Sequence, residues 1–448
     1  MTSPLLETAS RVAGWARHGE EVEAYVGRSS DTRVVVYGGE IESLSSATTE
    51  GVGIRVVSGG RQGFAYAGSL DPAVVEETVA EARDNAGFGT PDEHVGLALP
   101  DRVPAADLDL WREDLASFAP EAKVDLALDL ERRVVAGDPR IRSVESSSYG
   151  DGAGQAAVAT STGISASWRR TACYVSAYAL AGEGDETQTG GGYSVGRSPA
   201  DLDVDKAAAD AVERSTRLLG ARKPASARLP VVLDNRITTT LLSILAGTLS
   251  GEAVLKGRSL FANRLGEEVA SPLLTLVDDP TDPDAYGAAA YDAEGLATRR
   301  NVLVDAGLLR SFVYNTYAGR RAGVASTGSA VRGGFKSPPG VGCRALTLAP
   351  GNESQAQILA RVGTGLLVQS VSGVHSGVNA VSGDFSVGAE GVLFRDGVLA
   401  EPVREITIAS TLQRMLRDVV AVGDDLEWLP GSAAGVTLAI DGMSMSGA

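Results

Sequence analysis

Residues 20–60 read EEVEAYVGRSSDTRVVVYGGEIESLSSATTEGVGIRVVSGG, and this stretch decides the fold class. Four segments within it alternate polar and apolar side chains or are rich in β-branched residues, namely 23–26, 32–37, 41–45 and 51–57. Glycine pairs at 38–39 and 59–60 lie where hairpin turns belong. The stretch therefore predicts an antiparallel meander of short strands.

Helices are predicted on both sides of this meander. Apolar residues recur at helical spacing over 5–17, and Asp71 followed by Pro72 is a helix-start signal that leads into 74–86. Further along, the pattern predicts helices at 121–136 and 205–218. Between them it predicts a glycine-rich turn at 189–192 and five strands, at 141–148, 155–161, 163–170, 171–180 and 193–195. Strands followed by a helix occur twice, which suggests an internal structural repeat.

The chain is expected to form two domains, because 448 residues exceed one ordinary core. A polar, proline-bearing connection at 221–226 places the boundary between residues 1–222 and 227–448. After it come a strand at 229–233, a helix at 235–250 and short β segments, with hairpin signals at 305–307 and 395–397. The predicted class is α+β, with an N-terminal antiparallel sheet carrying helices and a β-rich C-terminal domain with few helices.

Composition excludes several classes of protein. The formal net charge of −17 disfavours nucleic acid and anionic membranes as partners, since both are bound through clustered Lys and Arg. No run approaches the ~20 apolar residues of a membrane span, and residues 1–20 do not resemble a signal peptide. Cys173 and Cys343 make no metal spacing, so reduced thiols in a cytoplasmic protein are expected.

The segment 374–389, VHSGVNAVSGDFSVGA, is the strongest candidate for a binding site. It sets small polar or acidic groups between glycines and contains no Lys or Arg, which suits a backbone that grips an extended peptide. We expect His375, Ser376, Asn379 and Asp384 to contact substrate. The alternative is a tightly wound connection between two strands, in which Asn379 and Asp384 cap turns; the two roles can coexist.

The residues do not support a catalytic or metal site within this chain alone. Catalytic zinc needs about three protein ligands, and the chain holds three histidines, of which only His375 lies in a site-like segment. No His or Cys follows His375 at i+3 or i+4. A cysteine hydrolase would need Cys343 beside a base, and His375 could reach it only through the fold. A small buried thiol is the more ordinary role for Cys343. We therefore assign no catalytic residue and no metal ligand.

Three groups of residues together resemble the TldD/PmbA family, also called modulator of DNA gyrase. They are GVGIRV at 51–56 with GFAYA at 63–67, YDAEGLATRRN at 291–301 with Gly307, and SGVN at 376–379 through SGDFSVG at 382–388. PVREITIA at 402–409 and VGDD at 422–425 agree with the same family. The resemblance covers nearly the whole chain.

This resemblance implies a two-domain α+β protein of a cytoplasmic peptidase system that cleaves largely unfolded peptides. In that system a TldD-type subunit carries zinc on a His-Glu-x-x-x-His helix, assisted by a cysteine, and assembles with a PmbA-type (TldE) subunit. The corresponding stretch here, LLSILAGTLSGE at 241–252, contains no histidine. The expectation is therefore a PmbA/TldE-like subunit that carries no cofactor itself and assembles with a zinc-bearing TldD-like partner, as a heterodimer or higher heteromer.

Two alternatives stay open at this point. The chain could form a homodimer or higher homo-oligomer that hydrolyses a small amide or peptide conjugate in specialised metabolism, without the family's metal site. It could also be a non-catalytic peptide-binding or regulatory protein, as the gyrase label suggests. Bound zinc and hydrolysis by the purified chain would discriminate among the three.

Overall fold

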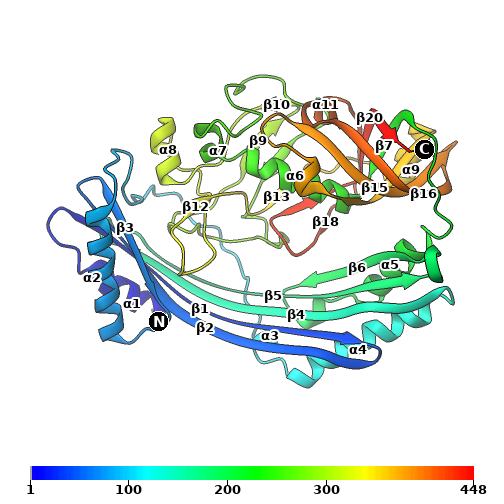
Figure 1. Ribbon diagram of the computed structural model, residues 1–448. Helices are drawn as coiled ribbons and strands as arrows, with labels where there is room; N and C mark the ends of the chain where they lie inside the picture. The colour runs from blue at the N-terminus through cyan, green and yellow to red at the C-terminus, as the bar shows by residue number, and fades with distance from the viewer. Residues whose placement is uncertain (1–2, 448) are drawn as a thin grey trace.

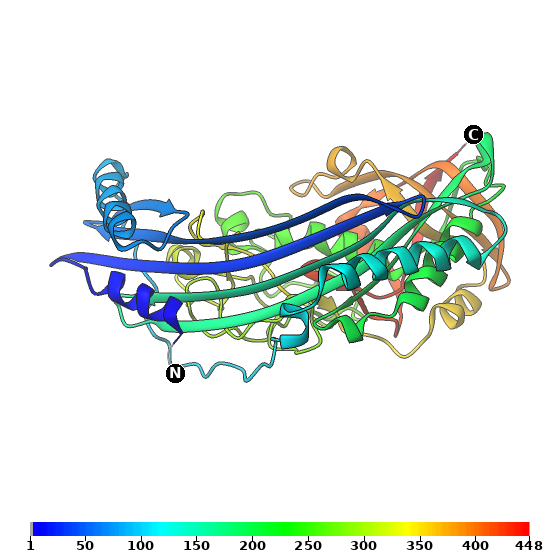
Figure 2. The same cartoon turned by 90° about the horizontal axis from the view of Figure 1, so that it is seen from below.

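The computed structural model describes residues 3–447, apart from the side chain of Asp185. One long antiparallel sheet is built from the first half of the chain, with strand order β3-β2-β1-β4-β5-β6. Figures 1 and 2 show that this sheet is elongated and curved, with the second half of the chain lying over its concave side. Its strands are β1 (Glu20–Tyr37), β2 (Glu40–Ser58), β3 (Arg61–Ala67), β4 (Ile141–Thr160), β5 (Ser165–Ala181) and β6 (Gln188–Gly196).

The predicted short strands prove to be halves of long ones. Segments 23–26 and 32–37 are both parts of β1, which runs without a break for 18 residues through the polar stretch between them. In the middle of β1, Ser30 pairs with Thr48 on one side and Ala153 on the other. Because ladder hydrogen bonds engage only backbone groups, two neighbouring strands hold this polar stretch extended. The polar middle of β4 is likewise paired on both sides, whereas the middles of β2 and β5 are held by one neighbour each, β1 and β4.

The internal repeat is visible in the order of elements. Helix, three strands and helix occur twice, as α1 (Pro4–Ala13), β1–β3 and α2 (Pro72–Phe88), then α4 (Pro120–Gly137), β4–β6 and α5 (Val204–Thr216). Asp71 caps α2 by accepting a hydrogen bond from the Ala73 backbone N–H (2.9 Å). Two apolar cores lie along the sheet, one under α1 and α2 and one under α4 and α5, and each also takes in residues from β4 or β1 of the other copy. Between the copies lies an extended stretch with the short α3 (Glu113–Ala116); two 3₁₀ turns flank β6, at Gly184–Glu186 and Pro199–Asp201.

The predicted turn at 189–192 is wrong, because these glycines lie within β6. A Cβ at Gly190 would lie 2.2 Å from the Ser215 backbone nitrogen, and one at Gly192 would lie 1.8 Å from the Ala207 carbonyl oxygen. Both contacts are with α5, so the glycines allow the helix to pack directly on the strand. Glycine here serves close packing and not a change of direction.

The second half of the chain forms a closed barrel. The strand order is β16-β15-β14-β7-β20-β17. Because β16 also pairs with β20, the five strands from β16 to β20 in this order close into a barrel. β7 pairs with β14 in parallel and with β20 antiparallel. The bounds are β7 (Ala227–Leu233), β14 (Gly365–Ser372), β15 (Asp384–Arg395), β16 (Val398–Thr411), β17 (Val419–Val422) and β20 (Leu438–Ser446).

Short strands and helices surround this barrel and share its core. A second sheet contains β10 (Leu308–Leu309), β9 (Asn301–Asp305), β8 (Leu276–Asp278), β13 (Leu346–Leu348), β19 (Ala433–Gly435) and β18 (Glu427–Trp428), and a small hairpin pairs β11 (Ala330–Val331) with β12 (Gly340–Val341). The helices are α6 (Asn235–Thr248), α7 (Gly251–Leu255), α8 (Thr316–Ala322), α9 (Gln355–Val362), α10 (Val374–Gly377) and α11 (Leu412–Arg417).

The two predicted Asp-containing hairpins are present, and β10 in the first of them consists of Leu308 and Leu309 only. Asp396 and Gly397 both have positive φ (50° and 77°), as the turn between β15 and β16 requires. The overall class is mixed α+β, as predicted. Within residues 3–447, no helix is long and apolar enough to cross a membrane.

Candidate functional site

The stretch 241–252, where the sequence resemblance places a metal-binding helix, begins on helix α6 and ends on α7. Asp234 begins α6 by accepting a hydrogen bond from the Ile237 backbone N–H (2.9 Å), and its apolar face is buried in the barrel core. Its residues, NRITTTLLSILAGT, include no His, Cys, Asp or Glu. Nor do the residues that the structure describes contain any group of three or more such side chains placed to hold a metal ion.

A pocket of about 430 Å³ lies beside the C-terminal end of α6. Gly247, Glu252, Lys256 and Cys343 are among its lining residues. Burial raises the pKa of the Cys343 thiol well above its ordinary value, and the nearby Asp278 charge raises it further. Because a thiolate is the reactive form, Cys343 is not prepared to act as a nucleophile. Cys173 is buried in the core under α4 and α5, where burial followed by Asp201 raises its thiol pKa to about 12.

The segment 374–389 forms the connection between β14 and β15 together with the start of β15. His375 and Ser376 lie on the single turn of α10, and the Ser376 hydroxyl donates to the Gly373 carbonyl (3.2 Å). Asn379 Oδ1 accepts hydrogen bonds from the backbone N–H groups of Val381 (2.9 Å) and Ser382 (3.1 Å). The side chains of Asn379 and Asp384 therefore stabilise the turn, and all four predicted contact residues are exposed on it.

The structure brings the four predicted residues to one loop. In that loop, Asn379 and Asp384 still have side-chain groups that can form further hydrogen bonds. Asp384 Oδ2 accepts from the Ser382 hydroxyl (2.7 Å), and the Asn379 backbone N–H donates to the Asp384 carbonyl (2.9 Å). Neither the Asn379 side-chain NH₂ group nor Asp384 Oδ1 bonds to any part of the chain that the structure describes. Turn capping and peptide contact are thus compatible at both residues.

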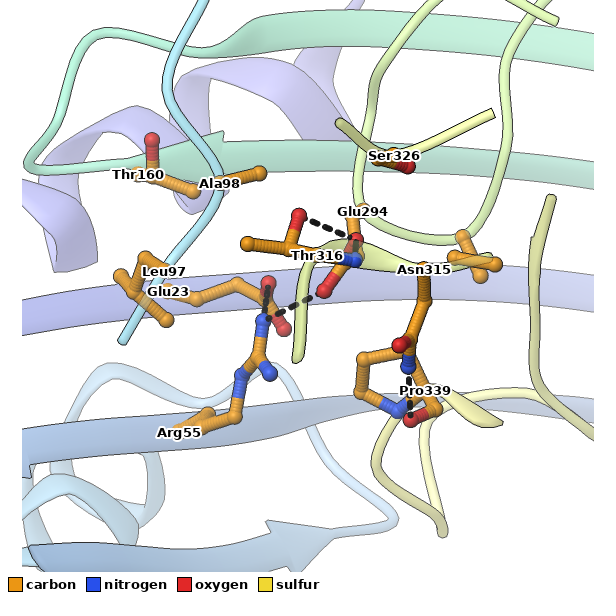
Figure 3. Close-up of polar contacts among 12 residues, drawn as sticks. Glu23, Arg55, Leu97, Ala98, Thr160, Glu294, Asn315, Thr316, Ser326 and Pro339 are labelled. Carbon is orange, nitrogen blue, oxygen red and sulfur yellow. Dashed lines mark hydrogen bonds and ion pairs between the residues drawn. The ribbon is translucent and has the colours of Figure 1, made fainter. Parts of the chain in front are cut away.

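A buried group of charges, here called the junction cluster, joins the long sheet to the second half of the chain. It consists of Glu23 on β1, Arg55 on β2, Glu294, Arg332 and Thr316 at the start of α8. Arg55 Nη2 lies 2.6 Å from Glu23 Oε2 and 3.7 Å from Glu294 Oε1. Figure 3 marks both contacts with dashed lines. The exposed fractions of the four charged side chains are between 1% and 5%.

Each carboxylate of the cluster has several partners. Glu23 Oε1 accepts from Arg332 Nη2 (2.8 Å), and Glu294 Oε2 accepts from the Thr316 backbone N–H (2.9 Å) and hydroxyl (2.7 Å). Burial raises the pKa of Glu23, but the charges of Arg55 and Arg332 and their hydrogen bonds outweigh it, so the net shift is downward. Glu23 therefore stays ionised in the interior and holds the sheet against loops from the second half.

Glu23, Arg55 and Glu294 lie within the sequence motifs, but the motifs predict no contact among them, and Arg332 and Thr316 lie outside every motif. The available signal was Arg55, a charged residue in the middle of the apolar run 51–57 of a predicted strand. Such a charge is buried only when it is paired. Its partners come from positions 23, 294 and 332, so their identity required the fold.

Comparison with known proteins agrees with this architecture. Residues 22–86 match the PmbA/TldA metallopeptidase domain 1, residues 113–219 the central domain, and residues 226–447 the C-terminal domain of that family. Metalloprotease PmbA of Escherichia coli O157:H7 is 30% identical over 94% of this chain and 91% of its own length.

Solved structures show the same fold. A candidate modulator of DNA gyrase from Bacteroides thetaiotaomicron superposes with a TM-score of 0.89 at 28% identity, covering 100% of both chains. TldE from Thermococcus kodakarensis gives a TM-score of 0.88 at 24% identity, covering 95% of this chain and 97% of its own. Given the match of family domains along the sequence and the similarity to PmbA over almost its whole length, this chain belongs to the PmbA/TldD family of metallopeptidases.

Proposed function

We propose that this chain is the PmbA/TldE-like, non-metal subunit of a cytoplasmic peptidase of the TldD/TldE type. A TldD-like partner supplies the zinc ion and the general base, while this chain completes the assembly and helps to hold unfolded or modified peptides. The observation that carries the proposal is the composition of the stretch 241–252, which contains no His or Cys and a single carboxylate, Glu252, where the family's metal-binding helix is expected. Residues 1–222 and 227–448 are proposed as its two domains.

The chemistry of the remaining candidate groups supports the same assignment. The raised thiol pKa of Cys343 disfavours a cysteine nucleophile, and His375 lies exposed on α10. A chain with these side chains is better suited to binding a substrate than to cleaving it. The similarity to metalloprotease PmbA favours a role in proteolysis.

The loop 374–389 is our candidate for the surface that holds the peptide. The free NH₂ group of Asn379 can donate to a peptide carbonyl, and Asp384 Oδ1 can accept from a peptide N–H. His375 and Ser376 lie nearby on α10 and offer further polar contacts. A polymer of amides presents both kinds of partner at every residue.

Purification of the chain alone and then together with a TldD-like protein from the same cell tests the assembly. We expect no zinc and no peptide hydrolysis in the lone chain, and both in the mixture. Zinc with hydrolysis in the lone chain would contradict the proposal. Hydrolysis without metal would instead select a self-sufficient hydrolase, and a mixture that forms no complex would favour a separate binding protein.

Substitutions in the loop test the proposed contact surface in the active assembly. We expect Asn379→Ala and Asp384→Ala to raise KM for an unfolded peptide several-fold. Asn352→Ala, at an exposed asparagine between β13 and α9, serves as the matched control. Unchanged binding and turnover in both loop variants would leave Asn379 and Asp384 with a structural role only.

A further inference from the structure

A second pocket, here called the sheet pocket, lies where the loop 332–336 covers the concave face of the long sheet. Its volume is about 380 Å³, in the lower part of the range of small-molecule sites. Tyr25 on β1, Trp168 on β5 and Phe335 on the loop line it. A Cβ at Gly53 would lie 2.2 Å from the Phe335 carbonyl oxygen, so the loop is in direct contact with the sheet.

Positive charge is concentrated around the sheet pocket in a chain whose net charge is −17. Asp292 is the single carboxylate among its lining residues, against five cations: Arg28, Arg170, Arg332, Lys336 and Arg344. Asp292 Oδ1 accepts from the backbone N–H groups of Glu294 (2.8 Å) and Leu296 (3.0 Å), and Oδ2 from that of Ala330 (3.1 Å). Among the described residues Asp292 forms no ion pair with an arginine, although its charge attracts Arg344 at longer range.

Several of these cations have no anionic partner. Arg28 pairs with Glu50 (2.6 Å), and Arg332 pairs with Glu23 through Nη2. The side chains of Arg170 and Arg344, by contrast, form no hydrogen bond or ion pair with the described residues. Burial, followed by repulsion from Arg170, lowers the pKa of Arg344. Two guanidinium groups that repel each other are therefore held together in a partly desolvated site.

Unsatisfied donors in the pocket give a second, independent indication of a ligand. The side chain of Arg332 is only 1% exposed, yet its Nε and Nη1 atoms have no acceptor among the described residues. Arg344 Nε is also buried without an acceptor. Leaving a charged donor unsatisfied costs about 1–3 kcal/mol or more. A bound anion would offset the positive charge of these guanidinium groups, although the unsatisfied nitrogens themselves are shielded from solvent.

We propose that the sheet pocket binds the free C-terminal carboxylate of an extended peptide. Guanidinium groups match the geometry of a carboxylate and can bind it through two parallel hydrogen bonds. Tyr25 and Trp168 provide an apolar wall for the last side chain, and Gln155 and Thr49 offer neutral partners for the adjoining amide. This inference rests on the proposed function in one respect, that peptides are the ligands of this protein.

Calorimetric titration of the lone, full-length chain tests the proposal without a partner or zinc. The probe is N-acetyl-alanyl-phenylalanine, compared with the same dipeptide as its C-terminal amide. We expect the acid to bind at least about tenfold more tightly than the amide, which corresponds to ~1.4 kcal/mol. Arg344→Met and Arg170→Met should each abolish this preference. Arg417→Met, at an exposed arginine on α11, removes the same charge elsewhere and should retain it.

Three outcomes would overturn the proposal: no binding of the acid, equal binding of acid and amide, or full displacement of the acid by an equal concentration of inorganic phosphate. Arg344→Met should melt close to the wild type, because it removes both an incompletely satisfied cation and the attraction of that cation for Asp292 and Asp278. If it does not fold, the Arg170→Met titration decides the question. Failure of a TldD-like complex to hydrolyse peptides would refute the proposed function while leaving this binding result unaffected.

Discussion

Replacement of Glu23 by glutamine isolates the contribution of the junction cluster. The change keeps the shape of the side chain but removes the negative charge that Arg55 (2.6 Å) and Arg332 (2.8 Å) share. Both arginines stay buried, and the nearest remaining carboxylate oxygen of the cluster lies 3.7 Å from Arg55. Breaking a buried ion pair on one side costs about 3–5 kcal/mol, because the other charge is left uncompensated. We expect a loss of unfolding free energy in that range.

A matched control lies on the same two strands. Glu50 on β2 pairs with Arg28 on β1 at 2.6 Å, the same distance as Arg55 to Glu23, but these side chains are 38% and 57% exposed. Surface pairs contribute only about 0–1 kcal/mol. Glu50→Gln should therefore be close to neutral. Both variants replace a paired glutamate by glutamine, so they differ in the burial of the ion pair that is broken.

Urea unfolding at pH 7, followed by circular dichroism, measures both changes. Because the folded pKa of Glu23 lies below its ordinary value of 4.5, its stabilising effect is full above that value and is lost as the pH falls through the folded pKa. The difference between wild type and Glu23→Gln should thus shrink in acid. A loss below about 1 kcal/mol at pH 7, equal to that of Glu50→Gln, would refute the reasoning.

Three further predictions follow from single contacts. Gly53→Ala should destabilise the protein by about 1–3 kcal/mol, because its Cβ would collide with the Phe335 carbonyl, and it should increase protease cleavage in the loop 332–336. The control, Gly247→Ala, has no atom within 4 Å of the added Cβ and should gain about 0.5–1 kcal/mol of stability. Asp278→Asn should become more stable relative to wild type as the pH rises from 4 to 7 in thermal melts, since burial raises the Asp278 pKa to about 6 and ionisation then disfavours the folded state; a parallel pH dependence would contradict this. Asn379→Ala should lose about 1 kcal/mol in urea unfolding through its two turn hydrogen bonds, and an unchanged midpoint would rule out the capping role.

Local patterns were sufficient to predict the fold class and the five helices of ten or more residues, whereas the shorter helices α3 and α7–α11 were not predicted. Helix α2 begins where Asp71-Pro72 predicted, and hairpins occur at Gly307 and Gly397. The long strands were missed because a polar stretch such as the middle of β1 is extended by its neighbours and not by its own side chains. The closed barrel was missed for a similar reason, since pairing of β16 with β20 depends on residues far apart in sequence.

The candidate sites also differ in whether their residues are consecutive or distant in the sequence. Loop 374–389 could be proposed as a binding segment from the sequence because its polar and glycine residues are consecutive. The junction cluster and the sheet pocket combine residues from both halves of the chain, such as Arg170 on β5 and Arg344 after β12. A lone arginine in a strand carries no information about which distant charge will face it. Only the fold shows that Arg344 meets another cation.

The position of β7 within the barrel has a consequence for synthesis on the ribosome. β7 ends at Leu233, but one of the strands that pair with it begins at Gly365 and the other at Leu438, roughly 200 residues later. At ~5–20 residues per second, about 10–40 s pass between the emergence of β7 and that of its last neighbour. During this time the apolar strand VVL at 231–233 has no partner and is a natural target for chaperones. The strands of the long sheet, complete by Gly196, need not wait in this way.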